Sequence, residues 1–364
     1  MAERYVGIDI GTYNIKIADI IRNKNTFEIS SHTILKTPRF LTNNGRVSDD
    51  GELLALLKAE ITKKKYKSKK AIVIINDSLV ITRDMEMPVA NSKELDRMVK
   101  LDASEYLPSD ISEYTMRHKI LIPACKSPTN KNYVLMTSIK SNLALDFYNI
   151  LKKAGLKIVT FDVSVNSMIK YYKLVTNAGF TNSYREEKTI AMLDLGANYV
   201  KLVIFQKGNP VSQHIMNHSS QKIDILIANS LNIESEEAEE LKITFGLQYL
   251  YEHTEDDFMA KTVGTIINTQ VDMMLEDVYK HIQSHASKEG SSHVDEIWLV
   301  GGMSLMKGLN NYISDSFSIP CNLVEPNSVT RFSLEEIIGY ADRKKMLEQF
   351  QFYVNIIGAS WKGE

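Results

Sequence analysis

The sequence predicts an α/β protein of two lobes, built from two copies of one strand–turn–strand unit. The first copy opens the chain at Tyr5–Ile17 and the second lies at Ala191–Ile204. At a constant offset the copies share three residue types: Asp9 with Asp194, Gly11 with Gly196, and Lys16 with Lys201. A unit repeated far apart in one chain indicates a duplicated domain. The length of 364 residues also suits two domains better than one.

Composition limits the classes of function. An apolar content of 44% and a charged content of 24% are typical of a folded soluble protein. The net charge of −2 gives no reason to expect nucleic acid or a bare membrane surface as partner. The two cysteines have no metal-like spacing, and no apolar run approaches the roughly 20 residues of a membrane span. The N-terminus leaves no room for a signal peptide, so we expect a cytoplasmic protein that meets a membrane only through a partner.

The first half alternates between strands and helices. We expect strands at Tyr5–Ile10, Ile15–Ile21, Thr26–Leu35, Ala71–Ile75, Ser78–Arg83, Tyr114–Ile122, Tyr133–Ile139 and Leu156–Phe161. We expect helices at Glu52–Ile61, over Glu94–Tyr106 with Ser92 as its cap, at Leu143–Ala154 and at Ser164–Val175. The group of elements at about 85–140 interrupts the repeated fold. We therefore predict a small inserted subdomain there, inside a first lobe of residues 1–180.

The second half begins after the polar stretch Thr176–Lys188, which is the best domain boundary. Three strands are expected up to Ile215. They are followed by helices at Ser219–Leu231, Ser235–Leu250 and Val263–His285, a strand at Glu296–Val300, a helix at Leu305–Phe317 and a strand at Cys321–Val324. This gives a second lobe of residues 181–364 with a helical subdomain at about 219–290.

The repeated aspartates carry the strongest chemical signal. Asp9 and Asp194 each end a strand, just before a turn of exposed backbone N–H groups. Such amides bind phosphate oxygens, while a carboxylate holds the water shell of Mg²⁺. An ordinary hairpin is the plain alternative, and the repetition at matched positions favours phosphate. No GxxxxGK[ST] loop is present, so a P-loop site is not supported.

Other patterns are ambiguous when taken alone. The double glycine in Leu299–Ser304 lets a flat ring or a phosphate approach the backbone, or serves close strand–helix packing. Within Glu237–Lys242, Glu239 and Lys242 are spaced for an ordinary surface ion pair. His281 and His285, with Asp277 one turn earlier, lie on a single helix, and three ligands from one helix rarely converge on an ion. For these histidines a solvated helix face is the favoured interpretation.

Together the first three patterns resemble the nucleotide-binding signature of the actin-like ATPase superfamily, whose fold has two lobes built from duplicated RNase H-like domains. The resemblance implies ATP and Mg²⁺ in the cleft between the lobes, with Asp9 and Asp194 organising the metal and water. The residues it assigns to the nucleotide are Gly11, Thr12, Tyr13, Asn14, Lys16, Gly196, Ala197, Asn198, Glu239, Lys242, Gly301, Gly302 and Met303.

Within that superfamily the chain resembles the PilM family of type IV pilus assembly proteins, relatives of the division protein FtsA. The matching segments are Met87-Pro88, Lys93–Pro108, Ala154–Val163, Val300–Pro320 and Ile357–Ala359. The resemblance implies an FtsA-type inserted subdomain and a cytoplasmic scaffold at the inner face of the cell membrane. Its implied partner is the cytoplasmic N-terminal peptide of PilN, bound near that subdomain, with coupling to the pilus motor ATPases and possible self-association.

One departure bears on catalysis. The family's interdomain helix usually begins with an acidic residue, but Ser164 stands there, and Asp162 is the candidate catalytic substitute. A phosphoryl-transfer site without a water-positioning group holds ATP and hydrolyses it very slowly, so enzymatic activity stays open. Two alternatives also stay open: an FtsA-like filament-forming protein, or a small-molecule kinase of the same superfamily. Few residues follow Gly358, without the amphipathic membrane helix of FtsA, and no substrate domain of a kinase is evident.

Overall fold

A computed structural model describes residues 2–23, 26–38, 42–43, 46–47, 50–75, 79–127, 129–179, 187–247, 258–288, 290–327, 329–332 and 347–362. The chain forms two compact units. Unit 1 comprises the described residues of 1–179, 327–343 and 355–364, and unit 2 those of 180–326 and 344–354. Two stretches after residue 326 thus return to unit 1, whereas the division at residue 180 assigned them to the second lobe.

Unit 1 is organised by a six-stranded sheet in the order β10-β6-β1-β2-β3-β16. Its strands are β1 (Glu3–Ile10), β2 (Asn14–Asn23), β3 (Thr26–Lys36), β6 (Lys70–Ile75), β10 (Lys157–Val163) and β16 (Thr330–Phe332). The central strand β1 is buried from Tyr5 to Ile10, as expected of a strand covered on both faces. Its apolar side chains pack with those of α1 (Asp50–Lys64) and α3 (Ser141–Lys153). A separate two-stranded ribbon of β4 (Thr42–Asn43) and β5 (Arg46–Val47) lies in the same unit.

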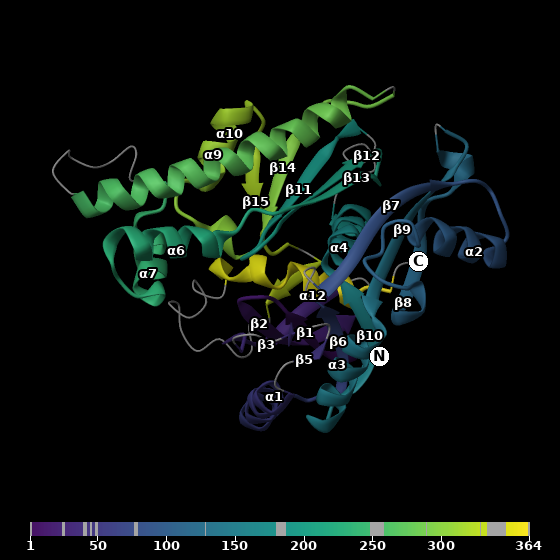
Figure 1. Ribbon diagram of the computed structural model, residues 1–364, viewed down its shortest axis with the longest axis horizontal. Coiled ribbons are helices and arrows are strands. Elements are labelled where there is room, and N and C mark those ends of the chain that lie inside the picture. The colour runs from purple at the N-terminus through teal and green to yellow at the C-terminus, as the bar shows by residue number, and fades with distance from the viewer. Residues whose placement is uncertain are drawn as a thin grey trace. The chain divides into compact units, whose positions relative to one another are not determined.

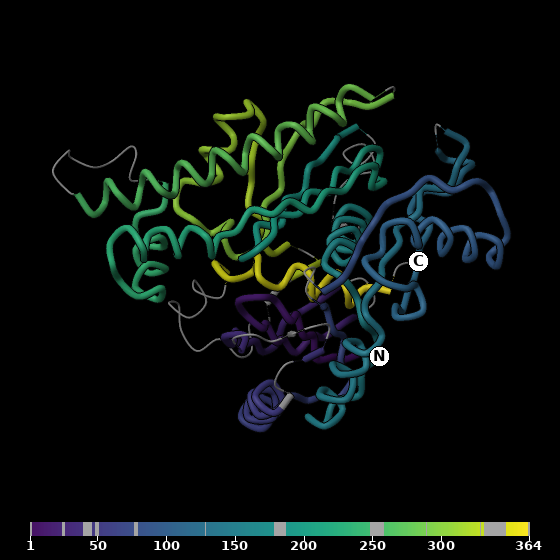
Figure 2. The backbone as a smooth tube through the Cα atoms, in the orientation of Figure 1, coloured from purple at the N-terminus to yellow at the C-terminus, as the bar shows by residue number. Residues whose placement is uncertain are grey.

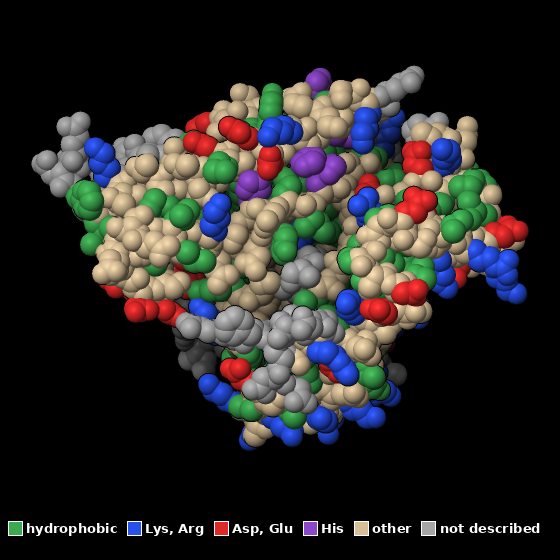
Figure 3. All heavy atoms as spheres, viewed as in Figure 1, with side chains coloured by type: hydrophobic (Ala, Val, Ile, Leu, Met, Phe, Trp, Pro, Cys, Tyr) green, Lys and Arg blue, Asp and Glu red, His purple; other side chains and the backbone are tan. Residues whose placement is uncertain are grey.

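Two helices from distant parts of the chain pack together in unit 1. These are α4 (Ser164–Gly179) and α12 (Val354–Ser360). A Cβ at Gly7 of β1 would collide with Ile356, and one at Gly358 would collide with the carbonyl of Ser167 on α4. The C-terminal stretch therefore packs against the first strand, which Figure 2 shows as yellow beside purple. The lysines between Lys63 and Lys70, at the end of α1 and in the loop after it, are all exposed. Figure 3 shows Lys and Arg side chains gathered over the part of unit 1 that contains α1.

The inserted subdomain has its own sheet and core. The three-stranded sheet β7-β9-β8 consists of β7 (Val80–Met87), β9 (Asn132–Lys140) and β8 (Tyr114–Ile122), and α2 (Ser92–Ala103) packs against it. The short 3₁₀ turns Ile111–Glu113 and Ala124–Lys126 flank β8. The prediction of Ser92 as the cap of α2 is wrong. Asn91 caps this helix through a capping box with Glu94, since its side chain accepts from the N–H groups of Lys93 and Glu94 at 3.1 Å.

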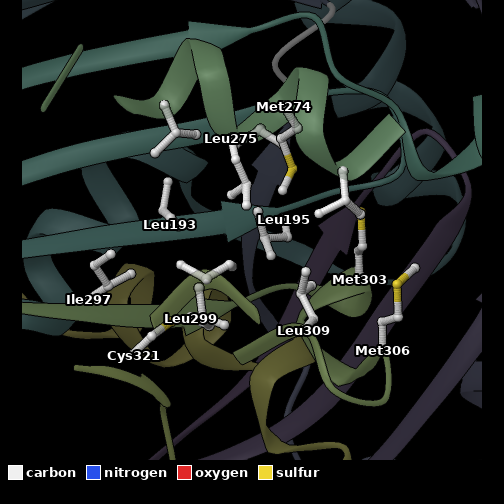
Figure 4. Close-up of a cluster of buried hydrophobic side chains, with 14 of the residues drawn as sticks. Leu193, Leu195, Met274, Leu275, Ile297, Leu299, Met303, Met306, Leu309 and Cys321 are labelled. Carbon is white, nitrogen blue, oxygen red and sulfur yellow. The ribbon is translucent and has the colours of Figure 1, made fainter. Parts of the chain in front are cut away.

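Unit 2 contains a five-stranded sheet in the order β13-β12-β11-β14-β15. Its strands are β11 (Ile190–Leu195), β12 (Val200–Gln206), β13 (Asn209–Met216), β14 (Glu296–Val300) and β15 (Cys321–Leu323). Its helices are α6 (Ser220–Leu231), α7 (Ser235–Phe245), α9 (Phe258–Ala286) and α10 (Leu309–Phe317). Figure 1 shows α9 running along the sheet. Figure 4 shows the core between them, where Met274 and Leu275 of α9 meet Leu193 and Leu195 of β11.

At two helices a glycine sets a boundary that differs from the prediction. α7 ends at Phe245 because Gly246 has a φ of +57°, and the rest of the predicted helix to Leu250 falls mostly outside the described residues. The predicted helix at Leu305–Phe317 starts late, at Leu309. A 3₁₀ turn occupies Gly302–Leu305, and Gly308, with a φ of +80°, separates the two. A further 3₁₀ turn at Phe350–Phe352 precedes α12.

Candidate functional site

The first glycine turn joins β1 to β2 in unit 1. Asp9 is buried near the end of β1 and lies opposite Lys16 in the strand register. The Lys16 ammonium donates to Asp9 Oδ2 at 3.2 Å. The N–H of Gly11 donates to the carbonyl of Asn14 at 3.1 Å, and a Cβ at Gly11 would lie 2.7 Å from that oxygen. Only glycine therefore fits this tight turn.

The second glycine turn, in unit 2, repeats this construction. Asp194 lies opposite Lys201, and the two side chains meet at 2.8 Å. The N–H of Gly196 donates to the carbonyl of Tyr199 at 3.1 Å, and a Cβ at Gly196 would lie 2.8 Å from that oxygen. The repeat predicted from the sequence thus extends to the strand register and to the hydrogen bond that closes the turn.

Neighbouring segments hold each turn in place. Thr37 binds the first turn, since its N–H donates to the carbonyl of Tyr13 at 2.9 Å and its hydroxyl to that of Gly11 at 2.8 Å. The second turn is bound at Ala197, whose carbonyl accepts from the Ser219 hydroxyl at 2.7 Å. The turn residues Thr12, Asn14 and Asn198 are half-buried, as are their neighbours. Both turns are therefore fixed at their base and open at their tips.

The double glycine follows β14, which runs parallel to β11 with Val300 opposite Asp194. Gly301 has a φ of +86°, and a Cβ there would collide with Asp194 Oδ1 and lie 2.7 Å from the carbonyl of Leu195. A Cβ at Gly302 would lie 2.7 Å from the Phe352 ring, and Met303 is buried. Within unit 2 the structure thus brings Gly301 against Asp194, while Gly302 serves packing.

The E-x-x-K pair lies on α7. Lys242 is buried and its ammonium meets Asp224 Oδ1 of α6 at 2.6 Å. It also donates to the hydroxyl and carbonyl oxygens of Ser220, at 3.0 and 3.3 Å, while Glu239 is half-buried. Sequence reasoning missed Asp224 and Ser220, although Asp224 is the single acidic residue in the predicted helix Ser219–Leu231. The default of a surface pair is wrong for Lys242, which ties α7 to α6.

Asp162, the candidate catalytic substitute, is the penultimate residue of β10 in unit 1. Its Oδ1 accepts from the N–H of Val163 at 2.8 Å and from the Asn166 amide at 2.7 Å. Its Oδ2 accepts from the ammonium of Lys170 at 2.8 Å. Ser164, at the start of α4, is buried beside it. These contacts make Asp162 an anchor for the first two turns of α4, and its catalytic role stays a prediction.

The histidines of α9 do not form the exposed face that was expected. The ring of His281 stacks on that of His214 at 3.7 Å. His285 is buried, and Asp277 pairs with His218 at 2.7 Å and with Lys280 at 3.0 Å. A solvated face is therefore wrong at His285.

Comparison with known proteins identifies the family. A family model described as type IV pilus assembly protein PilM matches residues 7–357. The chain belongs to the PilM family. Its fold matches a chain of a PilM–PilN type IV pilus biogenesis complex with a TM-score of 0.80 at 18% identity, over 98% of this chain and 97% of that one.

A second structure supports the fold class. It is the ethanolamine utilization protein EutJ from Carboxydothermus hydrogenoformans, matched with a TM-score of 0.54 at 12% identity over 99% of this chain and 90% of that one. The two-lobed actin-like fold predicted from the sequence is confirmed. The chain is thus a type IV pilus assembly protein of actin-like fold. No helix in its described part is long and apolar enough to cross a membrane.

The turns of this PilM-family chain fit a phosphate better than they fit a preformed metal centre. Each turn has a glycine where a side chain would fill the space, and each has a lysine at its base. Asp9 and Asp194 are oxygen ligands of the kind that Mg²⁺ prefers. Each already accepts from a lysine, however, and no group of three or more metal-ligating side chains converges among the described residues.

Unit 1 also contains a cavity of about 250 Å³ between the inserted subdomain and the main sheet. Its apolar lining includes Val80, Leu135, Ile139 and Phe161, and its polar lining includes Ser138, Asp162 and Asn166. The buried atoms Ser138 Oγ and Asn166 Oδ1 have no hydrogen-bond partner in the described part of the chain. The lining therefore combines an apolar surface with a small number of polar and basic groups, among them Arg117 and Lys119 of β8, as ligand pockets commonly do.

Proposed function

We propose that this protein is an ATP- and Mg²⁺-binding scaffold of the type IV pilus inner-membrane assembly complex, whose nucleotide state controls binding of a partner peptide. The observation that carries the proposal is the pair of glycine turns with matched aspartate and lysine. Nucleotide contacts would come from Thr12, Tyr13, Asn14, Ala197 and Asn198 around the turns, and from Glu239, Lys242, Gly301, Gly302 and Met303 for the adenosine. The carboxylate of Asp9 would supply an oxygen ligand for the metal. The cation that neutralises Asp194 is the subject of the further inference below.

The proposed partner is the cytoplasmic N-terminal peptide of PilN, the protein named with PilM in the matched complex. Its proposed seat is the cavity of unit 1. β10 is an edge strand of the six-stranded sheet and β8 an edge strand of the inserted sheet, and residues of both line the cavity. An extended peptide can pair with such an edge and place an apolar side chain in the pocket below.

Nucleotide and peptide would act through linkage. If ATP changes the affinity for the peptide, the peptide must change the affinity for ATP by the same factor. Asn166 and Lys170 both donate to Asp162, the carboxylate proposed to position the water, and restrain it. We therefore expect slow ATP turnover and a role as a switch. The proposed location is the cytoplasmic face of the membrane, held there by partners, with coupling to the pilus motor ATPases.

The test is a titration with a labelled PilN N-terminal peptide, with and without Mg-ATP. We expect binding whose affinity shifts with nucleotide. Absent binding in both states would reject the scaffold and favour a filament or a kinase. The Asp9→Ala variant should lose Mg-ATP binding while keeping its fold, and normal ATP affinity in that variant would contradict the site.

The peptide seat has a matched control on α3. Ala144 lines the cavity, whereas Leu145, the next residue, is exposed on another face of the same helix. Ala144→Trp fills the cavity and should weaken peptide binding by about tenfold or more, the cost of one lost apolar contact. Leu145→Trp should leave the affinity unchanged. Equal affinities in the two variants would place the peptide elsewhere.

A further inference from the structure

Lys201 is a residue that the superfamily resemblance does not assign to the nucleotide. It occupies in β12 the place that Lys16 occupies in β2, opposite the aspartate and at the base of the glycine turn. Its ammonium lies 2.8 Å from Asp194 Oδ2, against 3.2 Å for Lys16 and Asp9. The side chains of Lys201 and Asp194 are 10% and 6% exposed, against 18% and 10% for the other pair. The Lys201–Asp194 ion pair is therefore shorter and less exposed to solvent than the Lys16–Asp9 pair.

The surroundings of Asp194 leave little access for a hydrated metal. Oδ2 meets the lysine, and the backbone of Gly301 lies so close to Oδ1 that a Cβ there would collide with it. Mg²⁺ usually keeps several of its waters and demands octahedral geometry around a carboxylate. A lysine ammonium needs no such shell. It is a compact point charge that binds phosphates.

We propose that Lys201 is the resident cation of the second turn, so that its ammonium, and not Mg²⁺, neutralises Asp194 and faces the phosphate of a bound nucleotide. The nucleotide part of this inference rests on the proposed function. The divalent cation is then needed on the Asp9 side alone. The contribution of unit 2 to nucleotide affinity would then depend only weakly on the Mg²⁺ concentration.

The first test needs no nucleotide. Removing the ammonium in Lys201→Met leaves a buried carboxylate that requires another cation. We expect this variant to gain a Mn²⁺ site relative to the native chain, measured by electron paramagnetic resonance of free Mn²⁺. The double variant Asp194→Asn/Lys201→Met, which removes both charges and so guards against misfolding, should not gain it. Asp194→Asn alone should bind as many Mn²⁺ ions as the native chain.

Two results of this titration would overturn the proposal. One is an unchanged Mn²⁺ count in folded Lys201→Met, which would make the lysine a purely structural partner. The other is loss of an Mn²⁺ ion in Asp194→Asn, which would show that Asp194 holds the metal despite Lys201.

The second test uses ATP in EDTA and at rising Mg²⁺, with Lys16→Met as the matched control. We expect Lys201→Met to bind ATP about tenfold more weakly than the native chain in EDTA, the loss of one cation–phosphate contact, and to recover as Mg²⁺ rises. Lys16→Met should stay weak at all Mg²⁺ concentrations. Native-like ATP affinity of Lys201→Met in EDTA contradicts the proposal. Absence of ATP binding in the native chain rejects the proposed nucleotide function, while the Mn²⁺ result still decides the role of Lys201.

Discussion

The β1–β2 hairpin of unit 1 and the β11–β12 hairpin of unit 2 share one backbone arrangement and differ in how deeply their charged pair is buried. Both pair an aspartate with a lysine across the strands, and both close the turn with a glycine N–H bond of 3.1 Å. The ion pair of unit 2 is shorter and less exposed than that of unit 1. The two copies therefore share the tight turn that requires glycine, and they differ in how far solvent reaches the ion pair.

A second difference lies in the neighbouring parallel strand. Ile74 stands opposite Asp9, and Val300 stands opposite Asp194. The next residue is Ile75, still in β6, in unit 1, but Gly301 with a φ of +86° in unit 2. The strand parallel to the aspartate-bearing strand therefore ends one residue earlier in unit 2 (β14) than in unit 1 (β6). Its end brings the backbone of Gly301 against Asp194. Unit 2 encloses its carboxylate, which is why charge loss there should cost more.

The largest expected effect separates Asp194→Ala from Asp9→Ala. Asp194→Ala leaves Lys201 buried without its partner, and we expect it to lower the free energy of unfolding of unit 2 by about 3–5 kcal/mol. Asp9→Ala should cost unit 1 about 1–2 kcal/mol, because the more exposed Lys16 can reach water. The measurement is denaturation in urea. Equal losses of unfolding free energy in the two variants would show that the lower exposure of the Lys201–Asp194 pair does not affect stability.

The two tryptophans allow each unit to be followed by itself. Trp298 lies in β14 of unit 2, and Trp361 lies in the C-terminal stretch of unit 1. In a Trp361→Phe background, fluorescence reports the unfolding of unit 2, and in a Trp298→Phe background that of unit 1. Asp194→Ala should move the Trp298 transition most.

A smaller effect tests the contact between Gly301 and Asp194. Gly301→Ala should destabilise unit 2 by about 3 kcal/mol, because the new Cβ is both strained and in collision. Gly155→Ala is the matched control: its φ of +88° is similar, but nothing lies within 4 Å of its Cβ. It should cost about 1 kcal/mol, the backbone term alone. Equal losses of unfolding free energy in the two variants would show that Gly301 does not pack tightly against Asp194.

Local patterns in the sequence predicted much of this site. The repeat was visible because aspartate, glycine and lysine recur at fixed spacing, and a hairpin fixes which of them face each other. The sequence also placed Gly301 and Gly302 directly after the strand Glu296–Val300, and the family resemblance assigned them to the nucleotide. The capping of α2 was misplaced by one residue, since Asn91 and Ser92 are both good caps and only geometry separates them.

Partners that are distant in sequence could not be predicted. Lys242 pairs with Asp224 on a different helix, and β16 joins the first sheet from nearly 300 residues away in the chain, beside β3. Neither contact has a local signature, because each depends on how helices and strands pack. The buried environment of His285 was missed for the same reason, as the sequence gives its helix face but not what covers that face.

The smallest expected effect is a difference in acid sensitivity between the units. In unit 1, burial and the nearby charge of Lys64 lower the pKa of His32 to about 4, and in unit 2 burial, with the charge of Lys288, lowers the pKa of His285. Both histidines are neutral above their unfolded pKa of about 6.5. As the pH falls below that value the unfolded chain binds the proton more tightly, so stability is lost. For His32 this loss runs from pH 6.5 to about 4.

The size of the His32 term should be on the order of 2 kcal/mol at pH 5. His32→Leu should therefore flatten the acid side of the Trp361 transition, and His285→Leu that of the Trp298 transition, each without affecting the other. Urea denaturation at pH 7 and pH 5 measures both. If the native slope persists in His32→Leu, the acid sensitivity of unit 1 comes from its carboxylates.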